Sequence, residues 1–98
     1  MLSKLTEVYT LTNFNRKNTT EYGLREIYIN PKSISMIREE PNMKRYLSEG
    51  KLPEGIDNRV EFSRVSINAP NHSSSIVVVG APHTIQEKLK QARQVLKG

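Results

Sequence analysis

The sequence predicts an α+β domain in which an antiparallel β-meander of about five strands is packed on one face by a carboxy-terminal α-helix. Three observations lead to this prediction. Short runs in which apolar and polar residues alternate recur along the chain, and this is the period of β-strands. An amphipathic run with helical spacing ends the chain. The 98 residues, 36% hydrophobic and 26% charged, suit a single globular domain over 1–98.

Three strands are predicted before the middle of the chain. The first spans 5–14 and is rich in β-favouring Val, Tyr and Thr, and the second spans 24–30. Pro31 then breaks the run, because it lacks an amide hydrogen and forces Asn30 toward extended geometry. The third strand, 33–39, is expected to lie antiparallel to the second. The first strand is expected to be at an edge of the sheet, where a partner's strand can pair with it.

The segment 40–58 reads as an insertion into the sheet, because it contains two prolines, two glycines and only scattered apolar residues. Within it, apolar residues at spacings of three and four predict a short helix over about 41–49. These residues are Met43, Tyr46 and Leu47.

A hairpin is predicted over 59–79. Its first strand has a defect, since Val60 and Phe62 share one parity whereas Val65 and Ile67 share the other. A straight strand sends one of these groups to water, so we expect a β-bulge or bend near Ser63 and Arg64.

The final helix is predicted over about 84–97. Thr84 and Glu87 have the spacing of a capping box, in which each side chain satisfies a free amide hydrogen at the helix start. An apolar stripe at helical spacing faces the sheet and comprises Ile85, Leu89, Ala92 and Leu96. A separate polar side, expected to face solvent, comprises Gln86, Lys90, Arg93 and Lys97.

The composition argues against catalysis. The chain has no cysteine, which excludes a thiolate metal site, and it has only two histidines and one aspartate for a nucleophile with its base and orienting carboxylate. His72 stands beside Ser73, but the composition of a turn explains this pair without chemistry. Its five glycines are scattered singly, which excludes a glycine-rich phosphate loop. We expect a non-enzymatic protein with no cofactor, metal or small-molecule substrate. The sequence lacks a membrane-spanning run and a secretion signal, and this favours the cytoplasm.

Two classes of binding function remain. In the first, the protein binds a protein partner or itself through Met43, Tyr46 and Leu47, or through an edge strand. The alternative for those three residues is that they fold back and close the open end of the sheet. In the second, the net charge of +5 serves nucleic-acid binding through a basic helix stripe, Lys90, Arg93 and Lys97. Cations near a helix carboxyl end also oppose the helix dipole, which explains the same stripe structurally.

Several features between residues 27 and 96 form one pattern. They are Ile-Tyr-Ile-Asn-Pro at 27–31, the Ile34 and Ile37 spacing, Val-Val-Val at 77–79 and an isoleucine-led helix at Ile85. The pattern resembles the small flagellar and swarming-motility FlbD proteins and their short phage-encoded relatives. That resemblance implies a small non-enzymatic module of a β-meander and a helix, here a phage-encoded accessory protein, and it carries over no binding residues. The insertion at 40–58 and the helix entry at 80–83 depart from the family pattern.

Overall fold

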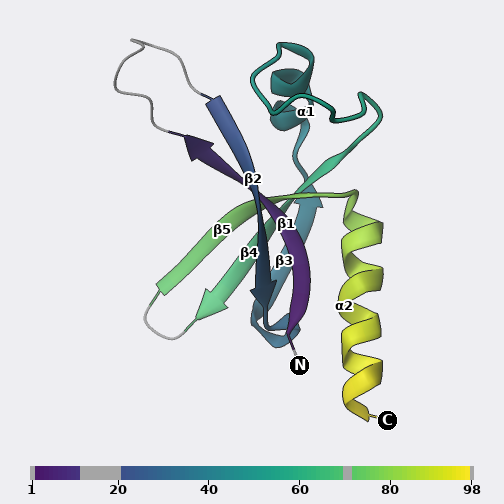
Figure 1. Ribbon diagram of the computed structural model, residues 1–98. Coiled ribbons are helices and arrows are strands. Elements are labelled where there is room, and N and C mark those ends of the chain that lie inside the picture. The colour runs from purple at the N-terminus through teal and green to yellow at the C-terminus, as the bar shows by residue number, and fades with distance from the viewer. Residues whose placement is uncertain (1, 12–20, 70–71, 98) are drawn as a thin grey trace.

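The computed structural model has the predicted α+β class, with one five-stranded antiparallel sheet and two α-helices (Figure 1). It describes residues 2–11, 21–69 and 72–97, with side chains left out at 69, 72 and 92–97. The elements, in chain order, are β1 (Ser3–Leu11), β2 (Glu21–Ile29), a 3-10 turn η1 (Pro31–Ser33), β3 (Ile34–Glu39), α1 (Pro41–Ser48), β4 (Phe62–Ala69), β5 (His72–Val79) and α2 (Pro82–Lys97). No helix within the described ranges is long and apolar enough to cross a membrane.

The strand order is β2-β1-β5-β4-β3, so the prediction of a simple meander is wrong in its connectivity. β1 lies inside the sheet between β2 and β5, and it is not the edge strand that we expected. β3 pairs with β4 and not with β2. β2 and β3 therefore form the two opposite edges of the sheet. The sheet departs from a meander because β1 pairs with β5, so β2 is left at one edge and β3 at the other.

The join between β1 and β5 is short. Its register contains only Glu7 opposite Val78 and Val8 opposite Val77, whereas β1 and β2 pair over nine positions. Figure 1 shows the β1–β2 hairpin crossing β5 steeply, so that its far end diverges from the rest of the sheet. A strong right-handed twist between strands produces this geometry.

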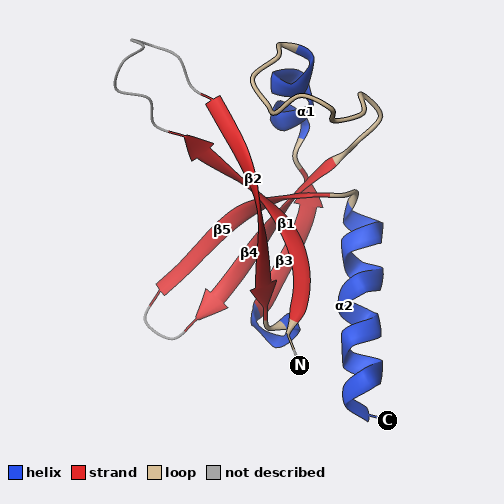
Figure 2. Cartoon of the chain, in the orientation of Figure 1, coloured by secondary structure: helices blue, strands red, loops and turns tan. Residues whose placement is uncertain are grey.

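Both faces of the sheet carry apolar clusters. Figure 2 shows the two helices, α1 and α2, beside the sheet. On one face, α2 packs on a cluster of Leu5, Val65, Val78, Ile85 and Leu89. On the other face, α1 and the loop after it cover one end of the sheet, where Val8, Met43, Leu52, Phe62 and Val77 are buried. The segment 40–58 therefore builds a second core on the face that α2 leaves open.

The two covered faces explain the parity defect of β4 without a bulge. Phe62 points to the α1 side and Val65 to the α2 side, and both are buried. The pairing of β4 with β5 is continuous from Phe62 to Ala69, so the bulge predicted near Ser63 and Arg64 is absent. The register shift lies instead in β3, between Ile34 and Met36.

α2 begins two residues before the predicted start, and the capping-box prediction is wrong. The Ile85 N–H donates to the Ala81 carbonyl at 3.0 Å, which makes Ala81 the cap residue and Pro82 the first helical residue. Proline suits that position because an N–H group at the first helical residue has no acceptor within the helix, so its absence costs no hydrogen bond. Thr84 therefore lies inside the first turn. The predicted apolar stripe is confirmed at Ile85 and Leu89, whereas the side chains of Ala92 and Leu96 lie outside the described ones.

Gly80 makes the sharp turn from β5 into α2. Its φ is +127°, and a Cβ there would lie 2.9 Å from Cδ1 of the buried Ile85. We expect Gly80→Ala to lower the free energy of unfolding by roughly 2 kcal/mol, from backbone strain and this contact together. Urea unfolding measures the loss. Gly55→Ala is the matched control, because Gly55 has a φ of +91° but open space around it; equal losses would contradict the role of Ile85.

A polar contact ties α1 to the sheet. Glu40, just before α1, is buried, and its carboxylate accepts a hydrogen bond of 2.9 Å from Nε of Arg64 in β4. Arg64 also donates through Nη1 to Ser75 Oγ in β5, at 3.0 Å. The ion pair therefore links the start of α1 to two neighbouring strands.

Candidate functional site

The residues predicted for protein binding do not form an exposed patch. Met43 is buried, and Tyr46 and Leu47 are half-buried against the second core cluster. The Tyr46 ring stacks on the Tyr22 ring with centroids 5.4 Å apart. This placement agrees with the alternative reading, in which the insertion closes one end of the sheet.

Of the predicted basic stripe, only Lys90 has a described side chain. It is exposed on α2. Arg93 and Lys97 belong to α2 by their backbone, but their side chains lie outside those that the structure describes. Whether the three cations share one surface thus stays a prediction.

No three His, Asp or Glu side chains gather in the described part of the chain in a way that could hold a metal ion. The pKa of the Asp57 carboxyl lies below its ordinary value because the Arg59 side chain and backbone both donate hydrogen bonds to it. The same ion pair raises the pKa of Arg59. Both residues are exposed in the loop before β4, where the pair holds a turn.

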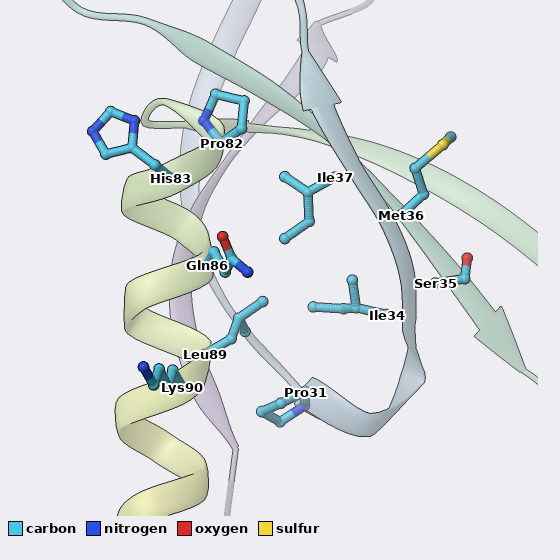
Figure 3. Close-up of a pocket in the computed structure, with 10 residues that line it drawn as sticks. All are labelled: Pro31, Ile34, Ser35, Met36, Ile37, Pro82, His83, Gln86, Leu89 and Lys90. Carbon is cyan, nitrogen blue, oxygen red and sulfur yellow. The ribbon is translucent and has the colours of Figure 1, made fainter.

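A groove of about 830 Å³ runs between β3 and α2 (Figure 3). Ile34 and Ile37 point into it from β3, and Leu89 points into it from α2. Pro31 lies at one end of the groove and Pro82 at the other. The groove has an apolar floor, while Gln86 and Lys90 of α2 give it a polar wall.

The bulge in β3 builds this floor. Alternation alone would place Ile34 and Ile37 on opposite faces of a strand, because they are three residues apart. The extra residue, Ser35, shifts the register so that both isoleucines face α2 while Met36 points away. The Ser35 hydroxyl donates to the Ser66 carbonyl of β4 at 3.3 Å, which holds the bulge. Sequence reasoning missed this site, although the odd isoleucine spacing was its signal.

β3 is also an edge strand, and among the described residues nothing pairs with its outer side. An edge strand presents a row of unpaired N–H and C=O groups. The opposite edge differs, because the N–H of Tyr22 in β2 donates to the Lys51 carbonyl of the α1 loop at 3.1 Å. The open backbone edge and the apolar groove therefore lie side by side only along β3.

Two cations lie near one end of the groove. Lys90 lines it from α2, and Lys32 is exposed on η1 next to Pro31, whereas Arg38 of β3 is exposed on the face opposite α2. Like Lys44, Arg45 and Lys88 elsewhere on the surface, these three cations form no ion pair with a described residue. Glu39, at the end of β3, is the exposed acidic residue of that strand.

A second hollow, of about 450 Å³, lies where β1 and β5 diverge below α1. Its charged residues are already paired inside the protein. Glu7 accepts a hydrogen bond from Nε of Arg25 at 2.7 Å, and Glu40 is held by Arg64. The β3–α2 groove, with its unpaired cations and strand edge, is therefore the stronger candidate.

Comparisons with protein-family models, curated proteins and solved structures gave no match. The resemblance to the FlbD-like proteins and their phage-encoded relatives stays a prediction from the pattern of apolar residues.

Proposed function

We propose that this protein is a small, non-enzymatic interaction module that binds an extended segment of a partner protein along β3. One observation carries the proposal: the open edge of β3 lies directly beside an apolar groove. In this mode of recognition the backbone edge supplies hydrogen bonds, and the groove selects alternate side chains of the bound strand.

The two sides of β3 define what the segment must contain. Every second side chain of an added strand points toward α2, where Ile34, Ile37 and Leu89 form an apolar floor. The side chains between them point to the opposite face, beside Met36, which is 50% exposed, and Arg38. The segment that fits has apolar residues alternating with polar or acidic ones.

The charges favour an acidic partner over a second copy of this chain. Lys32 and Lys90 near the groove, and Arg38 on the opposite face of β3, are unpaired and attract carboxylates. A second copy carries the same net charge of +5, which opposes association of the two chains.

Nucleic-acid binding through Lys90, Arg93 and Lys97 is the alternative function. Phosphate backbones are bound by several cations together, whereas Lys90 borders an apolar floor. Tyr28, the exposed aromatic residue among those described, pairs with Lys4 on the face opposite α2, away from this helix. The groove thus supports a peptide better than a polynucleotide.

The test uses a seven-residue acetylated and amidated peptide, Val-Glu-Val-Glu-Ile-Glu-Val, and titration by NMR. We expect chemical-shift changes concentrated on β3 and on the groove side of α2. Arg38→Glu should weaken binding about tenfold at low salt, because Arg38 lies on the face toward which the glutamates of the bound strand point. Lys88→Glu is the control, because Lys88 is exposed on α2 and does not line the groove.

Two further probes separate strand pairing from general charge attraction. Peptides N-methylated at one or the other set of alternate amides should differ, because only one set faces β3. Equal binding of the two would contradict strand addition. Sedimentation of the protein alone tests the second copy. A dimer that buries β3 would favour that occupant and overturn the proposal. Displacement of the peptide by mixed DNA or RNA oligonucleotides, abolished by Lys90→Glu, would favour nucleic acid and also overturn it.

A further inference from the structure

We infer that the bound segment runs antiparallel to β3 and that its carboxyl end, carrying the acidic residues, lies at the Pro31 end of the groove. This inference rests on the proposed function and adds a direction and a charge order to it. Three features of the groove carry it: the charges at its two ends, the position of the helix ends and the direction of β3.

The two ends of the groove differ in charge. Pro31 lies at the end where Lys90 lines the wall, and Lys32 follows Pro31 in η1. At the other end β3 finishes at Glu39, which is exposed, and α2 begins at Pro82. Arg38, next to Glu39, lies on the face opposite the groove. A carboxylate on the α2 side of the ligand is therefore attracted to the Pro31 end and repelled by Glu39 at the other end.

The helix dipole does not reverse this preference. Its partial charges act within the first and last turns of a helix. Lys90 lies about two turns before the last helical residue, Lys97, so the negative end of the dipole is remote from it. At the other end, the half-charge of the helix amino terminus is offset by the full negative charge of Glu39.

The direction of β3 then fixes the polarity of the ligand. β3 starts beside Pro31 and runs toward Glu39. A strand antiparallel to it starts near Glu39 and ends near Pro31. Every pair in this sheet is antiparallel, and antiparallel pairing is the more stable kind per residue. The acidic end of the ligand is thus its carboxyl end, and a free terminal carboxylate adds one more negative charge there.

The experiment compares two acetylated and amidated peptides of identical composition and reversed order. The first is Val-Thr-Val-Thr-Ile-Glu-Glu and the second is Glu-Glu-Ile-Thr-Val-Thr-Val. We expect the first to bind about tenfold more tightly at low salt, and the ratio to shrink as salt screens the charges. The double variant Lys32→Glu, Lys90→Glu should reverse the preference, while Lys88→Glu should leave it unchanged.

A spin label on the carboxyl end of the first peptide gives a direct readout. It should broaden the amide signals of Lys32 and Ser33 and spare those of Arg38 and Glu39. Equal affinity of the two peptides, or broadening at Glu39, would overturn the inferred direction while leaving strand addition intact. Failure of both peptides, and of the alternating peptide above, to bind would overturn the proposed function itself.

Discussion

Replacing Phe62 by alanine is expected to lower the free energy of unfolding by about 3–5 kcal/mol, the range for truncating a buried aromatic side chain. Phe62 is 1% exposed and lies at the centre of the cluster that joins α1 and its loop to the sheet. The stability of a domain of this size is about 5–15 kcal/mol. The loss is thus a large share of the total stability, and the variant should unfold at a clearly lower urea concentration than the parent protein.

Urea unfolding followed by circular dichroism measures the loss. Tyr28→Ala is the matched control, because Tyr28 is 61% exposed on the same sheet. Its effect should stay within about 0.5 kcal/mol. Similar losses in the two variants would mean that the α1 segment does not form a core on this face.

Arg64→Leu is expected to cost roughly 3 kcal/mol, because it leaves the carboxylate of Glu40 buried without a cation. The Glu40 side chain is 8% exposed and that of Arg64 is 30% exposed, so the pair is largely removed from water. Adding Glu40→Gln to this variant should restore about half of the loss, since the buried charge is then removed.

The control for this prediction is Arg59→Leu. Arg59 forms an ion pair of the same length, 2.9 Å, with Asp57, but its side chain is 90% exposed. Exposed pairs contribute little, so a change much smaller than that of Arg64→Leu is expected. Thermal unfolding of the four proteins compares the effects. A loss at Arg59 as large as that at Arg64 would show that burial does not set the value of these pairs.

Much of the fold follows from local pattern. The alternating runs predicted the strands, the spacing of Met43, Tyr46 and Leu47 predicted α1, and the stripe led by Ile85 predicted the buried face of α2. These features depend on neighbours within a few residues, which the sequence displays directly. Their ends shifted by a few residues, as at Pro82, where the helix starts without the capping box.

The strand order was not predictable in the same way. Whether β1 pairs with β2 alone or also with β5 depends on a contact between distant segments, and no local pattern encodes it. The parity defect of β4 was interpreted as a bulge because only one covered face was assumed. Once α1 covers the second face, Phe62 and Val65 both have a core to enter.

The candidate site was missed for a related reason. Its two walls, β3 and α2, are about 50 residues apart in the chain and meet only in the folded protein. Lys90 was predicted as a binding residue for its charge alone. In the folded protein it lines the same groove as Ile34, Ile37 and Leu89. The spacing of Ile34 and Ile37 was the sequence signal for the bulge in β3, and it was not recognised as one. A regular strand places residues three apart on opposite faces, so two isoleucines on one face require an extra residue between them.

The short join between β1 and β5 also sets the order of events when the chain folds. The β1–β2 hairpin and the β3–β4–β5 unit each form from nearby segments, whereas Glu7 must meet Val78 across about 70 residues of chain. Closing that loop is entropically costly, and it forms only two register pairs together with the packing of Leu5 and Val8 in the two core clusters. During synthesis the first hairpin must wait for the ribosome to release β5, so joining the two halves is expected to be the slow step of folding.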